Sequence, residues 1–593
     1  MPLALPKLLV RLIWSAFCAC TTFSCTPLTH APNLNGQSPD RDVTHKNNID
    51  VASSKNAYAE NLKDSLTNSY HCVNTDLYQI TRDAQSQRLH VHAIIRQIHS
   101  DEKICLPAFG QRYAERFTLN AVSNDVNQNL KIDFDPSGCA DNIAENNVVF
   151  DYTLLLQPID DFHLWLAGSL SPVLKNDFAA YPGEVLFIER NTSGCTLIDV
   201  VSQNEMDKVF STIPDHTTAQ THEFARFFAN HSFELTRSFF AFGQLKRIEV
   251  SGTTDISIAL ESTMDAYASL ILKDVLAIIG LYQSWMPSKL PAHISIFGFE
   301  NAFDVHHASG FARPNGVVLQ WGHKAALKTA ERRWLIAHEL FHLFNGEQLH
   351  FVRADYDKMS WFVEGTTQYL ALKAIRNLAL IHEKQYLEIL SDIVNQTMDV
   401  YRLPVEERQK IQNKPYLDGF FLSWMIEQQW LRYQPGLSLE GFWAFLAQNT
   451  DWHEPKTMMW LKNQLENYSQ FDFTPFFSLY ISGNARIPFE NILAKSGYCL
   501  RKYQTQKYDA GFRWNFEPAL ASYVILDVAP HSPAESLGIK RGDQFVMGKN
   551  SDWHAPDDKY LRRMMPDQRV LSFRVPMTPV LREMLEVVRC ADQ

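Results

Sequence analysis

The residues best suited to chemistry lie in the run His338-Glu339-Leu340-Phe341-His342. The segment 334–345 around them has no proline or glycine and many apolar residues, which predicts a helix. Residues four apart lie on one face of a helix, about one turn apart, so both imidazoles can bind one metal ion. Glu339 would then lie beside the metal, where its carboxylate can take a proton from water. The spacing therefore predicts a zinc site with a general base.

Hydrolytic zinc sites normally use three protein ligands and leave the fourth position to water. Glu364 is the candidate third ligand, because it lies 22 residues after His342 near the start of a second predicted helix, 361–376. That length allows a turn and an antiparallel return to the metal. A glutamate in the first turn also complements the helix dipole, so a capping role is the alternative. For the histidine pair, the alternative is two surface histidines beside an ordinary glutamate.

Peptide hydrolysis also needs a hydrogen-bond donor for the oxyanion of the tetrahedral intermediate. Tyr416 directly precedes an apolar helix predicted over 417–432. The apolar spacing does not distinguish Tyr416 from the other tyrosines of the chain, of which there are 21 in all. On this ground alone, a packing role is favoured over a catalytic one.

The elements that must hold these residues follow from the apolar spacing. Helical spacing dominates from 231 to 490, which predicts a mixed but mainly helical domain. Its expected helices are 256–285, 328–345, 361–376, 383–398 and 417–432, with one strand at 293–297. Residues 67–230 have strand-like runs such as 89–95 and 148–156, which predicts a β-rich domain. In 491–593, short strands flank a turn at Gly542-Asp543, which predicts a third domain.

The amino terminus has the layout of a signal peptide over residues 1–25. Lys7 and Arg11 precede an apolar stretch, 12–23, that is too short for a comfortable membrane span. The polar segment 26–66 then predicts a flexible tether. We expect an exported protein that is periplasmic, extracellular or lipid-anchored through Cys25 or Cys20, with plain cleavage and release as the alternative. No later apolar run is long enough to span a membrane, so lipidation is the one membrane contact that we expect.

The net charge and the cysteine content exclude some classes of protein and of metal site. The net charge of −11 argues against a dedicated nucleic-acid binder. Six cysteines follow the export segment without any C-x-x-C pair, which favours disulfides over a cysteine zinc site. We predict that Cys499 pairs with Cys590, bracketing the last domain. The other four cysteines allow several pairings.

The motifs H-E-x-x-H, W-F-x-E-G-x-T at 361–367 and Y-x-x-G at 416–419, followed by a PDZ-like tail, resemble the glycyl-aminopeptidase family of gluzincin zinc metallopeptidases. The resemblance implies a multidomain α+β protein, with an N-terminal β-rich domain, a thermolysin-like catalytic domain and a C-terminal PDZ domain. It also implies one zinc ion per chain on His338, His342 and Glu364, with Glu339 as general base. Tyr416 would stabilise the oxyanion.

The sequence also departs from the family pattern. Asn345 matches the Asn that follows the helix motif, but Phe344 stands where Trp is common. Family aminopeptidases carry an upstream glutamate that holds the free amine of the substrate, and His306 stands at the nearest counterpart. A histidine cannot supply that negative charge. We therefore expect a zinc metallopeptidase that acts on peptide or protein substrates, with aminopeptidase or endopeptidase action left open.

The alternative function is a zinc-stabilised, PDZ-containing scaffold without turnover. In either case, the PDZ-like tail is expected to bind an extended peptide by strand addition or to dock on the catalytic domain. Gly511-Phe512 is our candidate for its carboxylate-binding loop.

Overall fold

The computed structural model describes residues 75–592 apart from several short gaps. The gaps are 84–87, 100–101, 108–116, 125–127, 136, 142, 144–146, 156–172, 175–177, 191–193, 203–207, 214–223, 230–231, 301–307, 322–328, 410, 412–413, 453, 484, 518–521, 547–558, 565–569 and 577. The expected signal peptide and tether, with Cys20 and Cys25, lie outside the described residues, and so does His306. Within the described residues, no helix combines the length and apolar character needed to cross a membrane.

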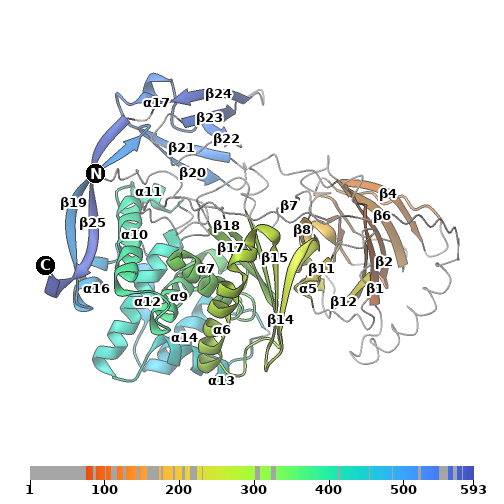
Figure 1. Ribbon diagram of the computed structural model, residues 1–593, viewed down its shortest axis with the longest axis horizontal. Coiled ribbons are helices and arrows are strands. Elements are labelled where there is room, and N and C mark those ends of the chain that lie inside the picture. Colours follow the sequence, from red (N-terminus) through yellow and green to blue (C-terminus); the bar gives the residue numbers. More distant parts are fainter. Residues whose placement is uncertain are drawn as a thin grey trace, which may run out of the picture.

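The amino-terminal region is built of strands, as its alternating sequence predicts (Figure 1). A six-stranded sheet in the order β12-β10-β1-β2-β6-β4 and a four-stranded sheet in the order β11-β13-β8-β7 contribute to one apolar core. Its elements are β1 (Thr75–Asp83), β2 (Arg88–Arg96), β3 (Ile104–Cys105), β4 (Phe117–Asn124), β5 (Cys139–Ala140), β6 (Asn147–Leu155), β7 (Val173–Leu174), β8 (Phe178–Pro182), α4 (Gly183–Leu186), β9 (Glu189–Arg190), β10 (Cys195–Ser202), β11 (Lys208–Ser211), β12 (Phe224–Ala229), α5 (Ser232–Thr236) and β13 (Phe239–Gly243). Because β13 pairs with β8 and β11, this sheet extends past residue 230.

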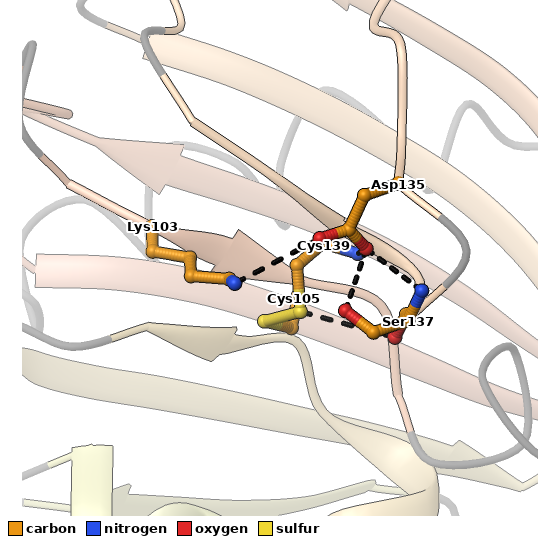
Figure 2. The surroundings of a disulfide bond; sticks show 5 residues. All are labelled: Lys103, Cys105, Asp135, Ser137 and Cys139. Atoms are coloured by element: carbon orange, nitrogen blue, oxygen red, sulfur yellow. Dashed lines mark hydrogen bonds and ion pairs between the residues drawn. A yellow bond between two sulfur atoms is a disulfide. The ribbon is translucent and has the colours of Figure 1, made fainter.

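A disulfide bond between Cys105 and Cys139 joins β3 to β5 at the margin of this region (Figure 2). The turn before Cys139 is organised by Asp135, whose carboxylate accepts hydrogen bonds from the Ser137 hydroxyl and from the backbone N–H groups of Ser137 and Cys139. These hydrogen bonds, led by the one from the Ser137 hydroxyl, hold the pKa of Asp135 below its usual value. Lys103 lies 3.8 Å from the same carboxylate.

The central region combines a five-stranded sheet with most of the helices of the chain. Its elements are β14 (Leu245–Val250), β15 (Asp255–Glu261), the 3₁₀-helix η3 (Ser262–Tyr267), α6 (Ala268–Trp285), β16 (His293–Glu300), β17 (Ala308–Arg313), β18 (Gly316–Trp321), α7 (Thr329–His342), α8 (Tyr356–Ser360), the π-helix η4 (Trp361–Thr366), α9 (Thr367–Asn377), α10 (Glu383–Tyr401), α11 (Val405–Arg408), α12 (Lys414–Tyr433), α13 (Leu439–Asn449), α14 (Met458–Ser469), α15 (Thr474–Phe476), the π-helix η5 (Phe477–Ile481) and α16 (Phe489–Lys495).

The five-stranded sheet, in the order β14-β15-β16-β18-β17, has two buried faces. On one face Ile258, Ile296 and Leu319 pack with α6 and α7, and on the other Phe297 and Val318 pack with phenylalanines of the amino-terminal strands. Strands β15, β16 and β18 are parallel, whereas β17 pairs with β18 in the antiparallel direction and forms one edge. The sheet therefore links the β-rich region to the helical region and leaves β17 beside the helices.

One expected helix begins later than its sequence pattern indicates. Residues 255–261 form strand β15, although a helix was expected over 256–285, and the α-helix α6 begins at Ala268. Six of the seven residues of β15 are buried, because it is an inner strand of a sheet covered on both faces. A short run that is apolar throughout has no period with which to distinguish a buried strand from a helix.

The carboxy-terminal region returns to strands. It contains β19 (Tyr498–Asp509), β20 (Phe512–Glu517), β21 (Ser522–Val528), α17 (Pro533–Ser536), β22 (Gln544–Val546), β23 (Lys559–Met564), β24 (Val570–Val575), β25 (Thr578–Arg589) and the 3₁₀-helix η7 (Cys590–Asp592). Strands β20 to β24 form a five-stranded sheet in sequence order. Strands β19 and β25 form a separate ribbon that lies beside α10 and α16 (Figure 1). The Cys499–Cys590 disulfide closes this ribbon, which confirms the predicted pairing.

The ribbon is held on the helical region by hydrogen bonds to helix α10. The Asn395 side chain donates to the carbonyl of Leu585 at 2.6 Å and accepts from its N–H at 2.9 Å. The N–H of Val587 donates to the Ser391 hydroxyl at 2.8 Å. These contacts satisfy strand groups that would otherwise be unpaired, so the carboxy-terminal region is docked on the helices.

Candidate metal centre

Helix α7 carries the two histidines of the expected metal site. Its interior is almost entirely buried, between the five-stranded sheet and helices α6 and α9, which explains its apolar sequence. Tyr282 of α6 donates a hydrogen bond to the carbonyl of Ala337, and Trp334 donates to the carbonyl of Gln368 in α9. His338 and His342 are 5% and 8% exposed, so the surrounding core fixes the direction of both rings.

The structure brings His338, His342 and Glu364 together. The Nε2 atoms of the two histidines lie 3.0 Å apart, and Glu364 Oε2 lies 3.2 Å from His342 Nε2 and 3.5 Å from His338 Nε2. Tetrahedral ligands of a zinc ion lie about 3.3 Å apart, which matches this triangle. Two largely buried imidazole nitrogens and a carboxylate oxygen that face one another at these distances are suited to hold a cation between them. The three residues fit a zinc ion, and together with water they complete four positions.

His342 is aligned through its second ring nitrogen. Its Nδ1 lies 2.8 Å from the carbonyl oxygen of Asn345 and donates to it in the tautomer that leaves a lone pair on Nε2. The side chain of Asn345, fully buried, donates in turn to the carbonyls of Phe362 and Val363 at 2.9 and 3.1 Å and lies 3.1 Å from the Thr367 hydroxyl. Asn345 thus links the end of the histidine helix to the turn that carries Glu364.

Glu364 lies in the π-helix η4, immediately before α9. A π-turn adds a residue to the helical turn and is common at functional sites. The segment packs closely on α12, where a Cβ on Gly365 would overlap the backbone of Gly419. The contact brings Tyr416, at the start of α12, to the same site. Its ring lies 6.0 Å from that of His338, and a hydrogen bond joins it to Glu364.

Burial and the charges of neighbouring side chains together set the pKa values of the two histidines and Glu364. Burial lowers the pKa of His338 to about 4, so this imidazole is neutral, as a metal ligand must be. Burial also acts to lower the pKa of His342, but the Glu364 carboxylate outweighs it and raises that pKa to about 9. The pKa of Glu364 is lowered, because the two histidines outweigh its burial. Without a metal ion, His342 and Glu364 therefore form a charged pair.

Glu339 points to the same site and is 2% exposed. Burial raises the pKa of its carboxyl to about 8, against the opposing effect of His342, which makes its carboxylate a stronger base. Its Oε2 atom is buried without a hydrogen-bond partner in the described part of the chain. An oxygen of this kind can accept a proton from water held beside the metal ligands.

The edge strand β17 passes directly over Glu339. A Cβ on Gly310 of this strand would lie 2.6 Å from Glu339 Cγ and 2.9 Å from its Oε1. Gly310 was missed in the sequence, although an isolated glycine in a strand is a signal of close backbone approach. The ion pair of Arg237 and Glu347 was also missed, because the two residues lie 110 positions apart and no local pattern connects them.

A comparison with known protein families matches the part of the chain that contains the candidate metal site. A model of the M61 glycyl aminopeptidase family matches residues 331–429, about a sixth of the chain, which include both histidines, Glu339, Glu364 and Tyr416. No curated protein sequence matches the chain.

Among solved structures, an aminopeptidase N family protein from Idiomarina loihiensis is similar, with a TM-score of 0.63 and 16% identity over 86% of this chain and 98% of its own. An M1 zinc metallopeptidase from Deinococcus radiodurans has a TM-score of 0.49 and 10% identity over 70% of this chain and 95% of its own. Aminopeptidase A from Legionella pneumophila, in complex with aspartic acid, has a TM-score of 0.48 and 10% identity over 88% of this chain and 57% of its own.

The similarity to the Idiomarina protein establishes a shared fold, whereas the other two structures are too distant to support an argument. The class of metallo-type aminopeptidases is supported by the family match over residues 331–429, whereas the Idiomarina structure shows the fold alone.

Proposed function

We propose that the chain is a zinc-dependent metallopeptidase that hydrolyses peptide bonds, with one zinc ion held by His338, His342 and Glu364. The observation that carries the proposal is the triangle of three ligand atoms with the unpaired carboxylate oxygen of Glu339 beside it. A bound zinc ion supplies a Lewis acid that activates water and polarises the scissile carbonyl.

The protein side chains carry out the remaining steps. Glu339 takes a proton from the attacking water and delivers it to the leaving amine. Tyr416 donates a hydrogen bond to the oxyanion of the tetrahedral intermediate, for which its hydroxyl is suited because its raised pKa keeps it protonated. The edge strand β17 can align an extended substrate by pairing with its backbone, above the general base.

The family match favours aminopeptidase action on a free amino terminus. Such action needs a carboxylate for the substrate ammonium group, and the segment 304–309, where the sequence has His306, is described only from Ala308 onward. Glu347 and Glu184 are two other carboxylates that could be considered for this role. Each already forms an ion pair, Glu347 with Arg237 and Glu184 with Arg313. The choice between exopeptidase and endopeptidase therefore rests on experiment.

The scaffold alternative predicts a fourth protein ligand that closes the site. In the described part of the chain, three side chains, not four, converge on the candidate metal position. A catalytic zinc site normally has three protein ligands, so this arrangement favours the enzyme proposal over the scaffold alternative.

We propose further that the carboxy-terminal sheet is a PDZ-like unit, that the protein is exported, and that its domains end near residues 230 and 490. The pairing of β13 with β8 favours moving the first boundary to the link between Gly243 and Leu245. Gly511 does not suit a carboxylate-binding loop, because its N–H donates to Asp509 at 2.7 Å and its carbonyl accepts from Ala529.

The test pairs metal analysis with a panel of peptides that have free or acetylated amino termini. The wild-type protein should hold one zinc per chain and cleave peptides, and cleavage of acetylated peptides would identify an endopeptidase. Glu339→Gln should keep the zinc and lose at least about a thousandfold in kcat. The matched control is Glu388→Gln on α10, a partly exposed glutamate whose only ion pair in the described part of the chain is with the exposed Lys384. Wild-type turnover in Glu339→Gln would exclude the proposed mechanism, and an inactive, zinc-loaded wild-type protein would support the scaffold.

A further inference from the structure

A cavity of 760 Å³ lies between the helical region and the carboxy-terminal ribbon, away from the metal centre. We call it the ribbon cavity. It is lined by side chains of α9, α10 and α12, by residues at the end of α16, and by the end of the β19–β25 ribbon where Tyr498 pairs with Arg589. The lining residues are Tyr369, Leu372, Lys373, Arg376, Asn377, Tyr386, Phe420, Trp424, Glu427, Gln428, Leu431, Arg432, Lys495, Ser496, Tyr498 and Arg589. Its volume lies in the range of about 300–1,000 Å³ that is usual for small-molecule sites.

The inner surface of the ribbon cavity is aromatic. Tyr369, Tyr386, Phe420, Trp424 and Tyr498 are each less than 10% exposed and pack on one another across three helices and a strand. Such a wall favours a flat or apolar body over a strongly hydrated ligand.

Two guanidinium groups are fixed on this wall. Arg376 lies 4.0 Å from the centre of the Tyr386 ring and donates a hydrogen bond to the Tyr498 hydroxyl at 2.9 Å. Arg589 lies 4.5 Å from the centre of the Tyr498 ring. Both arginines pair with the single carboxylate of Glu383, at 3.1 and 2.6 Å. These partners occupy part of each guanidinium edge. A guanidinium that is already held in place in this way loses little rotamer freedom when a planar anion binds its remaining N–H groups.

The ribbon cavity has more positive than negative charge. Lys373 is neutralised by Glu427 and Glu440, both at 2.7 Å. Arg432 and Lys495 are exposed and form no ion pair with another residue in the part of the chain that is described. Five cations therefore face three carboxylates in a protein whose net charge is −11. A local surplus of this sign attracts an anion.

The ribbon cavity is separate from the metal centre but shares helices with it. The residues of the metal centre do not line it. Lys373 follows Glu364 by nine residues, which is about 14 Å along the helix axis. A ligand here would contact α9 and α12, the helices that adjoin Glu364 and carry Tyr416.

We propose that the ribbon cavity binds a small organic monoanion, a carboxylate or sulfonate carried on an aromatic or apolar body. The body would pack on Tyr369, Phe420 and Trp424, and the anionic group would lie among Arg376, Arg432, Lys495 and Arg589. The surplus of two charges and the apolar wall disfavour a highly charged ligand such as a nucleoside triphosphate. Recognition at this site does not depend on the peptidase reaction.

The test uses the fluorescent anion anilinonaphthalene sulfonate, titrated into the full-length, zinc-loaded protein. Saturable binding of one probe per chain is expected. Charge reversal of the two unpaired cations, Arg432→Glu with Lys495→Glu, should weaken binding by about tenfold, on the scale of two exposed ionic contacts. Lys273→Glu with Lys540→Glu changes the net charge equally at exposed positions outside the cavity and should change the affinity less than about twofold. Equal affinity in both double variants would overturn the proposal.

Competition identifies the ligand chemistry. Phenylacetate should displace the probe, whereas benzyl alcohol and inorganic phosphate at matched ionic strength should not. Displacement by phosphate but not by phenylacetate would overturn the apolar part of the proposal. Removal of zinc with a chelator should leave probe binding unchanged, and loss of binding would place the probe at the metal centre and overturn the assignment. Circular dichroism and Tm check that each variant is folded. Arg432→Gln replaces the double variant if that does not fold.

Discussion

Gly365 and Gly419 pack backbone against backbone, with no room for a side chain on either residue. Gly365 follows Glu364 in the π-helix η4, and Gly419 lies one helical turn after Tyr416 in α12. This contact brings the candidate third metal ligand and the candidate oxyanion donor to the same side of the histidine helix. The neighbouring pair of Thr366 and Ser423, whose hydroxyls lie 2.7 Å apart, extends the contact along both helices.

Gly419→Ala should separate these helices, because its Cβ would overlap the carbonyl of Trp361 and the Cα of Gly365. We expect the free energy of unfolding to fall by about 1–3 kcal/mol or more, and zinc affinity to fall with it. Denaturant unfolding and metal titration measure the two effects. The control is Gly280→Ala in α6, where nothing lies within 4 Å of the added Cβ and the helix should gain up to about 1 kcal/mol. Equal stability in the two variants would contradict the packing argument.

Asn345→Ala removes three hydrogen bonds that join the histidine helix to the Glu364 turn. Zinc affinity should fall by about 10–100-fold, as is usual when a group that orients metal ligands is lost, while kcat per bound zinc changes little. Competition with a chelating dye measures the affinity. Asn449→Ala, at an exposed position, is the control. An unchanged zinc affinity would show that the turn holds Glu364 without Asn345.

Tyr416→Phe tests the proposed oxyanion donor. The hydroxyl is needed in the transition state more than in the ground state, so kcat should fall by about 10²–10³-fold with a smaller change in KM. Steady-state kinetics on a cleaved peptide gives both constants. Tyr480→Phe, a half-buried tyrosine far along the chain, should behave as wild type. A Tyr416→Phe variant with unchanged kcat would assign this residue to packing.

Zinc binding should depend on pH through His342. In the metal-free protein the Glu364 carboxylate outweighs burial and raises the pKa of His342 to about 9, so this histidine is protonated below that pH. A ligand must be neutral, so zinc binding at pH about 7.5 should release at least about one proton, and the apparent affinity should rise with pH until about 9. Calorimetry in buffers of different ionisation enthalpy counts the protons.

The Glu339→Gln variant isolates the contribution of His342 to this proton release. Burial raises the pKa of Glu339 to about 8, so its carboxyl can release a second proton when a cation arrives. The variant should therefore release the His342 proton alone. If neither the wild-type protein nor the variant releases a proton, His342 is already neutral before zinc binds.

The sequence by itself determined the local parts of this protein. The spacing of His338 and His342 on an uninterrupted helix, the alternating strands of the amino-terminal region and the pairing of Cys499 with Cys590 could all be predicted. The first two depend on a short-range period, and the disulfide was predicted because Cys499 and Cys590 bracket the last domain, not because the cysteine count fixes the pairing. Where the period is lost, as in the apolar run that forms β15, prediction of the element was wrong.

The tertiary structure alone decided how those parts meet. Glu364, Tyr416 and Asn345 come from separate segments, and their convergence depends on the Gly365–Gly419 contact and on buried hydrogen bonds between distant residues. The same is true of Gly310 above Glu339 and of the ribbon cavity, where α9, α12 and the disulfide-closed ribbon meet. Contacts across tens to hundreds of residues leave no periodic signal in the sequence, because many chain paths can satisfy the same local pattern and only packing selects one.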